Sequence, residues 1–213
     1  MERLICLVMG YVFGLFQTGY LYSRSKHMDI RNYGSGNSGS TNVLRVMGKK
    51  AGLVVFLGDA GKMILACLLT RVIFRSQPES LYLYLLYTGF GVILGHNFPF
   101  YMGFKGGKGI AASAGLLAST DWRLMLICLV VFVMAVAITR YVSLGSILVM
   151  ICFAIGMIYF GLIRRDYGLA DSCQTEFAGI ALAISLMGIW RHHTNIRRLL
   201  NGTENKLGAK KNA

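Results

Sequence analysis

Seven apolar runs occupy most of this 213-residue chain and limit what it can fold into. Hydrophobic residues make up 55% of the sequence, and the mean hydropathy of +0.56 is far above that of a water-soluble domain. Backbone groups inside a bilayer must pair within their own segment, so runs of this kind form helices. The runs lie at about 4–22, 51–74, 80–95, 110–119, 124–139, 144–163 and 176–190.

We therefore predict an all-α integral membrane protein with seven transmembrane helices, built as a single domain over residues 1–213. The run at 110–119 is shorter than the roughly 20 residues that a perpendicular helix needs, so this helix is expected to be short or tilted. No small-residue cleavage site follows the first run, which we interpret as an uncleaved helix. A polar, basic tail at about 203–213 is expected to be mobile.

The charges of the loops predict which way the helices cross. With alternate crossings, one side holds residues 23–50, 96–109, 140–143 and the tail from Arg191, which contain fifteen Lys and Arg but only two acids. The loops on the other side hold six basic and six acidic residues. Because basic loops stay in the cytoplasm, the N-terminus is expected outside and the C-terminus inside. Nucleic acid is not an expected partner, because the net charge of +13 lies in short loops and the tail.

The loop before the fourth run has the features of a phosphate-binding site. It contains Lys105, Gly106, Gly107, Lys108 and Gly109. Glycines let successive backbone N–H groups converge on an anion, lysines add positive charge, and the residues that follow would present a helix N-terminus to the same anion. A basic turn at the membrane surface is the alternative. A nucleotide P-loop is excluded, because Met102 and Gly109 stand where that motif needs Gly and then Ser or Thr.

Two further polar clusters fall on the same predicted side of the membrane. The first loop contains hydroxyl, amide, glycine and guanidinium groups suited to a phosphate, namely Ser35, Asn37, Gly39, Asn42 and Arg45. After the last run, His192 and Asn195 share one helical face, where a neutral imidazole can take or relay a proton. Taken singly, these segments also fit a flexible polar loop and a basic membrane exit that contacts anionic lipid. Zinc is not expected, since His192 and His193 point to different faces and no cysteine lies nearby.

Asp59 and Lys62 stand three residues apart within the second run. Ionisable residues inside a membrane are costly unless they pair, so we predict a structural ion pair turned away from lipid. The five cysteines form no Cys-x-x-Cys pair, and four of them fall inside apolar runs, which indicates small buried hydrophobes rather than disulfides. No feature of the sequence calls for a metal or an organic cofactor.

Together the three clusters resemble the motifs of the PlsY family, the bacterial membrane glycerol-3-phosphate acyltransferases that use acyl phosphate as the donor. The resemblance covers nearly the whole chain. Its motifs correspond to residues 34–45, 95–109 and 192–204, and residues 141–145 add a supporting match. Gln17, Ser40 and Met63 depart from the family pattern, but they remove none of the polar groups assigned to chemistry.

The resemblance implies transfer of a fatty acyl group from acyl phosphate to the 1-hydroxyl of glycerol 3-phosphate. The products would be lysophosphatidic acid and inorganic phosphate, in the first acylation of phospholipid biosynthesis. It also implies a bacterial inner membrane with the site facing the cytoplasm. The His-x-x-x-x-Asp motif of the other glycerol-phosphate acyltransferase class is absent. The expected partners are acyl phosphate, glycerol 3-phosphate and membrane lipid; the oligomeric state stays open, and a monomer is compatible with the sequence.

The predicted catalytic residues are Ser35, Arg45, His192 and Asn195. The predicted substrate-binding residues are Asn37, Gly39, Asn42, His96, Lys105, Gly106, Gly107, Lys108, Gly109 and Ser143. The predicted structural residues are Asp59, Lys62 and Glu204. His192 is expected to orient the nucleophile or shuttle its proton, and the alternative is that a substrate phosphate oxygen accepts the proton. Two rival functions stay open, which are transport of a phosphorylated solute and an acyltransferase that uses acyl-CoA.

Overall fold

The computed structural model describes residues 1–208, and residues 209–213, with Lys210 and Lys211 of the basic tail, lie outside the described part. Residues 1–208 form helices and connecting loops without a β-strand. The elements are α1 (Glu2–Gly14), α2 (Thr18–Arg24), η1 (Ile30–Asn32), α3 (Ser40–Met47), α4 (Lys49–Ile73), α5 (Pro78–Asn97), η2 (Phe100–Met102), α6 (Ile110–Thr120), α7 (Trp122–Thr139), α8 (Val142–Ile158), η3 (Tyr159–Ile163), α9 (Asp171–Trp190) and α10 (His193–Leu200).

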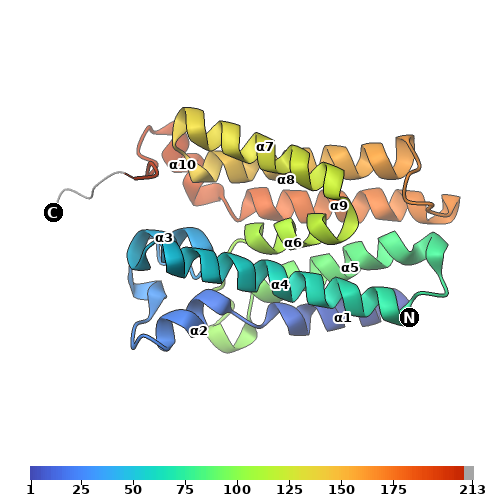
Figure 1. Ribbon diagram of the computed structural model, residues 1–213, viewed down its shortest axis with the longest axis horizontal. Helices are drawn as coiled ribbons and strands as arrows, with labels where there is room; N and C mark the ends of the chain where they lie inside the picture. The colour runs from blue at the N-terminus through green and yellow to red at the C-terminus, as the bar shows by residue number, and fades with distance from the viewer. Residues whose placement is uncertain (209–213) are drawn as a thin grey trace.

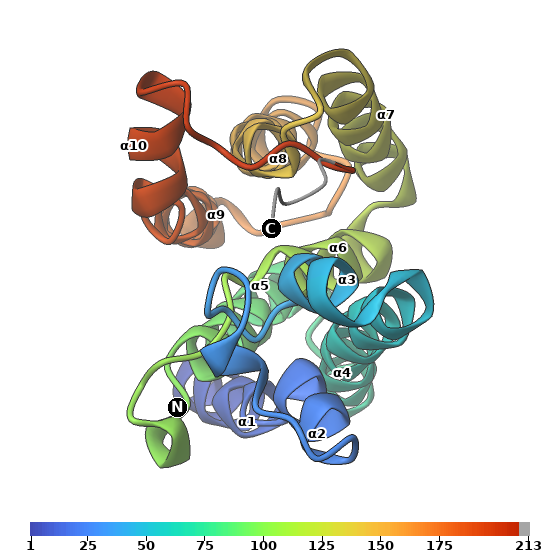
Figure 2. The same ribbon diagram turned by 90° about the vertical axis from the view of Figure 1, so that its left-hand side faces the viewer.

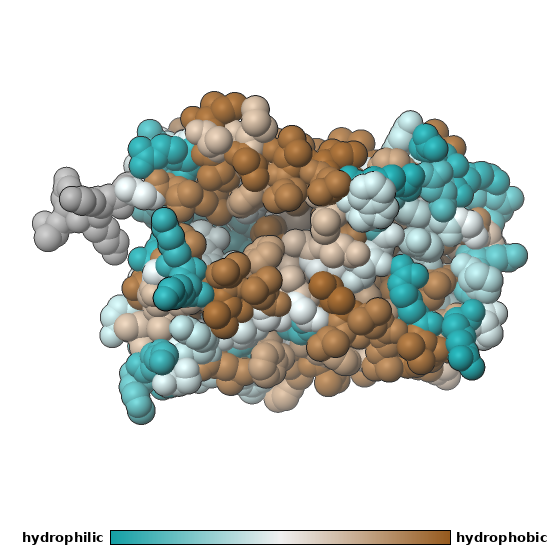
Figure 3. Space-filling model, viewed as in Figure 1, coloured by the Kyte–Doolittle hydropathy of each residue, from teal (hydrophilic) through white to brown (hydrophobic). Residues whose placement is uncertain are grey.

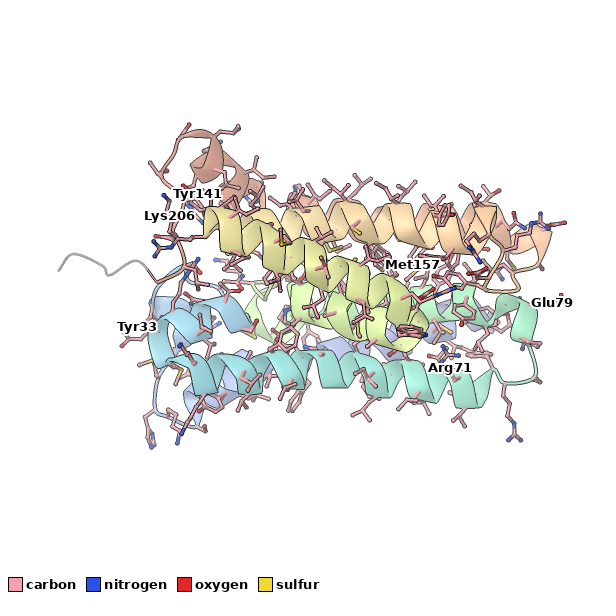
Figure 4. The ribbon with its side chains drawn as sticks, turned by 45° about the horizontal axis from the view of Figure 1, so that its top comes forward. Tyr33, Arg71, Glu79, Tyr141, Met157 and Lys206 are labelled. Carbon is pink, nitrogen blue, oxygen red and sulfur yellow. The ribbon has the colours of Figure 1, made fainter. Side chains whose placement is uncertain are left out.

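The long helices form two layers that run along a common axis (Figures 1 and 2). One layer contains α1, α4 and α5, the other contains α7, α8 and α9, and α6 lies between them. We call the end that carries α2, α3 and α10 the site end, and the end with the α4–α5 and α8–α9 turns the far end. Figure 4 shows Tyr33, Tyr141 and Lys206 at the site end, and Arg71 and Glu79 at the far end.

The protein is a multi-pass membrane protein. The helices long and apolar enough to cross a bilayer are Glu2–Arg24, Lys49–Ile73, Trp122–Thr139, Val142–Ile163 and Asp171–Trp190. Figure 3 shows an apolar belt over the middle of the molecule and hydrophilic residues at both ends. The count of seven crossings stays a prediction, because α5 is not among these five segments and α6 has only 11 residues.

Glycines let α1 and α5 pack with their backbones in contact. Gly10 and Gly14 of α1 face Gly91 and Gly95 of α5, and a Cβ added at Gly91 would lie 2.2 Å from the carbonyl oxygen of Leu7. Two helix backbones approach this closely only where no side chain intervenes. This packing fixes the end of α5, and with it the loop that follows, against the end of α1.

The first apolar run is broken, whereas the sequence predicts one continuous helix. The first helix ends at Gly14 and the second begins at Thr18, which leaves carbonyl oxygens without helical partners. The ammonium group of Lys62 donates to the carbonyl of Phe16 (2.6 Å) and to that of Gly14 (3.4 Å). An irregular backbone inside a membrane protein is tolerated only where such donors reach it. Lys62 therefore stabilises the break.

Gln17 and Tyr101 supply the remaining donors at the break. The buried Gln17 side chain donates to the carbonyls of Gly14 (3.2 Å), Gly95 (3.3 Å) and His96 (3.0 Å). The Tyr101 hydroxyl donates to the carbonyl of Leu15 (2.6 Å). Gln17 is one of the residues that departs from the family pattern, and its amide explains how this chain accommodates a polar residue here.

Asp59 and Lys62 form a buried ion pair, with 3.0 Å between Lys62 Nζ and Asp59 Oδ1. Their side chains are 1% and 5% exposed, so neither charge meets lipid. Thr18 also donates to Asp59 (3.0 Å), and Lys62 lies 2.9 Å from Nδ1 of His96. The pair thus joins α2, α4 and α5 directly below the site end.

The start of the basic tail makes two backbone hydrogen bonds at the site end. The backbone N–H of Thr203 donates to the carbonyl of Arg198 (2.8 Å), and the N–H of Leu207 donates to the carbonyl of Arg140 (2.7 Å). The mobility expected over about 203–213 stays a prediction. The rest of the predicted tail lies outside the described residues.

A Gly91→Ala substitution tests the α1–α5 packing. The added methyl group would overlap the backbone of α1, so we expect a loss of about 1–3 kcal/mol in the free energy of unfolding. Thermal unfolding of the detergent-solubilised protein measures it. Gly61→Ala is the matched control, because no atom lies within 4 Å of a Cβ at Gly61 and alanine is the better helix former. Equal unfolding temperatures for the two variants would contradict the packing.

Candidate active site

A cavity of about 130 Å³ lies at the site end between the two helix layers. Residues from α3 to α8, from α10 and from the loops beside them line it, and most of the predicted site residues are among them. These are Ser35, Asn37, Gly39, Asn42, Arg45, Asp59, His96, Lys108, Gly109, Ser143, His192, Asn195 and Glu204. The fold therefore brings together three polar clusters that are far apart in the sequence.

Two helices begin at this cavity. Gly109 precedes α6 with a φ of +83°, a conformation that favours glycine, and both Gly109 and Ile110 line the cavity. Gly39 precedes α3, whose first residues Ser40 and Thr41 also line it. The first N–H groups of a helix have no intrahelical partner and carry the positive end of the helix dipole. The sequence predicts the α6 terminus, and the α3 terminus adds a second anion-binding element.

Glu204 is the centre of a hydrogen-bond network at the mouth of the cavity. Its carboxylate accepts from Asn195 Nδ2 (2.9 Å), Ser143 Oγ (3.0 Å) and Arg198 Nε (2.7 Å). The side-chain oxygen of Asn195 accepts from Lys108 Nζ. Because the amide nitrogen of Asn195 is committed to Glu204, its oxygen faces Lys108. The network therefore fixes the position of both residues.

The cavity carries net positive charge. Its charged lining residues are Arg45, Asp59, Lys108 and Glu204. Both carboxylates are compensated from outside the lining, Asp59 by Lys62 and Glu204 by Arg198. Among residues 1–208, Arg45 and Lys108 have no carboxylate partner in a salt bridge, and this positive charge suits a phosphate.

The environment of Lys108 changes its protonation behaviour. Burial, together with the nearby positive charge of Arg198, lowers the pKa of Lys108 to about 8, while the negative charge of Glu204 opposes the change. Burial alone would raise the pKa of Glu204, but its hydrogen bonds from Arg198, Asn195 and Ser143 outweigh burial and keep the pKa below the usual value. At neutral pH the lysine is mostly protonated, and it loses its proton in mildly alkaline solution.

His192 is held as a neutral imidazole. Its Nδ1 donates to the carbonyl of Gly188 (2.7 Å), so Nε2 is left as an acceptor in the cavity. Burial, together with the positive charge of Lys108, lowers the pKa of His192 to about 4. The neighbouring His193 is exposed. His192 can therefore accept a hydrogen bond at neutral pH, but it is a weak base.

His96 stands at the base of the cavity, between the buried ion pair and the glycine-rich loop. The Lys62 ammonium has only donors, so His96 Nδ1 accepts from it and the ring proton sits on Nε2. A Cβ added at Gly107 would lie 2.0 Å from Nε2, which shows how closely the loop backbone covers the ring. Only glycine fits at that position without moving His96.

Three residues of the predicted phosphate loop lie outside the cavity lining. Gly107 packs on His96, and its carbonyl accepts from Arg191 (2.8 Å). Lys105 and Gly106 line a second, more open depression of about 430 Å³. This depression adjoins the cavity, because Ser35, Asn37 and Lys108 line both. Lys108 thus lines both the cavity and the outer depression, whereas Lys105 lines only the depression.

The side chains of Asn37 and Asn42 hydrogen-bond mainly to the backbone of the loops. The side-chain oxygen of Asn42 accepts from the N–H of Ser35 (2.8 Å), and its nitrogen donates to the carbonyls of Tyr33 (3.0 Å) and Asn37 (2.9 Å). The side chain of Asn37 donates to the carbonyl of Gly106 (3.3 Å). Both residues line the cavity, but their contacts hold the first loop in shape and against the glycine-rich loop.

The remaining wall of the cavity is apolar. Phe56 of α4, Phe132 of α7, Ile110 and Val142 line it. Figure 3 shows a hollow on this face between the apolar surfaces of α7 and of α3 and α4. Phe56 is 39% exposed, so this wall continues onto the belt that faces lipid. The sequence does not reveal these residues, because a phenylalanine inside an apolar run carries no distinguishing signal.

The comparisons with known proteins agree with this geometry. The family described as "Glycerol-3-phosphate acyltransferase" matches residues 4–202. The glycerol-3-phosphate acyltransferase of Clostridioides difficile (strain 630) is 41% identical over 209 residues, which is 98% of this chain and 97% of that protein. That of Thermoanaerobacter sp. (strain X514) is 36% identical over 211 residues, covering 99% and 98% of the two chains.

The same likeness extends to solved structures. The glycerol 3-phosphate form of PlsY (YgiH), an integral membrane glycerol 3-phosphate acyltransferase, superposes with a TM-score of 0.81 at 33% identity, covering 98% of this chain and 96% of that one. The lysophosphatidic acid form of PlsY gives a TM-score of 0.78 at 32% identity, with the same coverage. The chain belongs to the PlsY family of integral membrane glycerol-3-phosphate acyltransferases.

The pKa of Lys108 predicts that the pH profile of the activity has an alkaline limb, that is, a fall in rate at high pH. A protonated lysine binds phosphate, so the rate of acyl transfer should fall as the pH rises through about 8. Lys108→Arg keeps the positive charge at all these pH values and should move the limb upward, although the changed shape lowers kcat/KM. Lys105→Arg is the control, because Lys105 lies outside the cavity. An alkaline limb that stays in place in Lys108→Arg would remove this role.

Proposed function

We propose that this protein transfers a fatty acyl group from acyl phosphate to the 1-hydroxyl of glycerol 3-phosphate. The products are lysophosphatidic acid and inorganic phosphate, and the step is the first acylation of phospholipid biosynthesis. One observation carries the proposal: a positively charged cavity with two helix N-termini is walled on one side by Phe56 and Phe132 of membrane helices. A phosphate and a fatty chain can therefore be held side by side. The names of the related proteins support glycerol 3-phosphate as the acceptor.

The proposal assigns one phosphate to each helix N-terminus. Lys108 and the start of α6 hold the phosphate of the donor, while Ser35, Arg45 and the start of α3 hold that of glycerol 3-phosphate. Arg45 suits the second task, because its forked guanidinium matches the geometry of a phosphate. Lys105, in the outer depression, attracts the anionic substrates toward the cavity without touching them there.

Acyl phosphate is an activated mixed anhydride, so the transfer needs no covalent enzyme intermediate. The 1-hydroxyl oxygen attacks the acyl carbonyl carbon, the bond from that carbon to the phosphate oxygen breaks, and the hydroxyl proton passes to a phosphate oxygen. The low pKa of His192 supports this substrate-assisted route over a histidine base, because a general base works best with a pKa near the operating pH. His192 Nε2 and Asn195 then orient the hydroxyl, and Lys108 stabilises the leaving phosphate.

We also propose seven crossings, with the N-terminus outside and the site end facing the cytoplasm of a bacterial inner membrane. The segments predicted to be cytoplasmic contain α2, α3, the 98–109 loop, the α7–α8 turn and α10, and all of these lie at the site end (Figures 1 and 2). The α6–α7 turn lies part of the way towards the far end, where Arg123 pairs with Asp166 (2.8 Å), and we count α6 as a short crossing for that reason (Figure 1). The excess of basic residues in the loops of the site end supports this orientation.

One assay tests the reaction, the donor and the orientation. Purified protein receives glycerol 3-phosphate with either acyl phosphate or acyl-CoA, and phosphate and lysophosphatidic acid are measured. We expect both products with acyl phosphate and none with acyl-CoA. Sealed inverted membrane vesicles should form product from externally added glycerol 3-phosphate, whereas right-side-out vesicles should not. Product formed with acyl-CoA and not with acyl phosphate would show that acyl-CoA is the donor. Uptake of glycerol 3-phosphate without acylation would show that the protein is a transporter.

A His192→Ala variant tests the orienting role. Loss of a group that aligns the nucleophile should lower kcat by about 10- to 100-fold. His192 is already neutral above its pKa of about 4, so its titration should not change the wild-type rate between pH 5 and pH 8. The pH profiles of the wild type and the variant should therefore have the same shape over that range. His193→Ala, in the adjacent exposed residue, is the matched control. Near-wild-type turnover in His192→Ala would leave the assignment without support.

A further inference from the structure

The segment 203–208 crosses the site end beside the cavity, which Glu204 lines, and we call it the terminal strap. It leaves α10, runs over the site end and reaches the turn between α7 and α8, as Figure 2 shows. Figure 4 places Lys206 beside Tyr141, and the ammonium of Lys206 lies 5.6 Å from the centre of that ring. The strap thus connects α10 to the turn between α7 and α8.

The strap is anchored at its end by Arg140. The N–H of Leu207 donates to the Arg140 carbonyl (2.7 Å), while Nε and Nη2 of Arg140 donate to the Leu207 carbonyl (3.1 and 2.8 Å). Arg140 ends α7 with a φ of +62°, a conformation that is unusual for a residue with a side chain. Within residues 1–208 its guanidinium has no carboxylate partner, so its donors are given to the strap.

The other contacts of the strap lead into the cavity. Glu204 is 6% exposed and accepts hydrogen bonds from Ser143, Asn195 and Arg198. The carbonyl of Asn205 accepts a longer one from Arg45 (3.4 Å). Two of the proposed catalytic residues, Asn195 and Arg45, therefore contact the strap directly. Lys108 is linked to it through Asn195.

We propose that Arg140 is a positioning residue for acyl transfer, because its grip on Leu207 keeps the strap closed and Glu204 in place behind Asn195 and Lys108. Arg140 touches no substrate; it acts through three residues of backbone and one carboxylate. The inference rests on the proposed function, since acyl transfer is the reaction measured. The exposed position of Arg140 makes a purely structural role small, because a solvent-exposed hydrogen bond contributes little to stability.

An open strap would change the electrostatics of the cavity. The charged groups that act on Lys108 are Arg198, Glu204, Arg191 and Arg45. Burial is the largest cause of the lowered pKa of Lys108, and Glu204 of the strap lines the same cavity as Lys108. Water admitted by an open strap would raise this pKa toward the ordinary lysine value, and it would outweigh the loss of the nearby Glu204 charge.

Two variants open the strap in different ways. Arg140→Gly removes the guanidinium and suits the left-handed backbone at this position, so the fold is not strained. Leu207→Pro removes the N–H that donates to Arg140, and Leu207→Ala is its reference because it keeps that N–H. We expect kcat/KM for glycerol 3-phosphate to fall about tenfold in Arg140→Gly relative to wild type, and in Leu207→Pro relative to Leu207→Ala. Arg197→Ala removes an exposed cation from α10 and controls for charge.

The pH profile separates positioning from loss of structure. In Arg140→Gly the alkaline limb should move up by about one pH unit with the pKa of Lys108, while the unfolding temperature stays close to that of the wild type. A variant that merely lowered the amount of folded protein would not move the limb. Unchanged kcat/KM in both strap variants, or a lowered rate with an unmoved limb, would overturn the proposal. A wild-type protein without acyl transfer would instead overturn the proposed function.

Discussion

The arrangement of the site depends on a break in the first helix inside the bundle. A helix that stops among apolar neighbours exposes carbonyl oxygens that neither lipid nor water can satisfy. Lys62 reaches them from α4, and Asp59 compensates its charge. The same ammonium fixes the ring of His96, and the ring supports the backbone of Gly107. One buried cation therefore connects the course of the first helix to the shape of the glycine-rich loop.

The cavity above this pair combines two environments that are normally separate. Its carboxylates are compensated by partners outside the lining, so the field at its surface comes from Arg45, Lys108 and two helix N-termini. Its other wall consists of side chains that continue onto the lipid-facing belt. At such a site a polar headgroup can stay among polar groups while the attached hydrocarbon chain stays among apolar ones, so neither incurs a desolvation or exposure cost.

The sequence predicts the helical class, the membrane location and the position of several polar groups well. Lysine and glycine spacing indicates the start of α6 at the cavity, and the three-residue spacing of Asp59 and Lys62 indicates their pairing. It does not predict the break before Thr18, because Gln17 stands in an otherwise apolar run and its partners are carbonyls from distant residues. Nor does it predict Phe56 and Phe132, because their neighbours in the runs are equally apolar.

The tail illustrates a different limit of sequence reasoning. Its composition resembles that of mobile termini, and it gives no sign of the backbone hydrogen bonds that Thr203 and Leu207 make, because any residue except proline can make them. Lys105 and Lys108 likewise look equivalent in the sequence, and only the turn of the loop sends one outward and the other into the cavity. Such assignments depend on long-range packing, which local patterns do not encode.

The unequal lengths of α4 and α7 give the protein an uneven apolar perimeter. At about 1.5 Å per residue, the 25 residues of α4 reach roughly 37 Å, whereas the 18 residues of α7 reach about 27 Å beyond the polar turn at Asp121. Leu129, Val130 and Val133 of α7 are exposed, so lipid beside α7 meets a shorter apolar surface than lipid beside α4. A bilayer adapts to a short apolar surface by thinning locally, and α7 is also the helix that contributes Phe132 to the cavity wall.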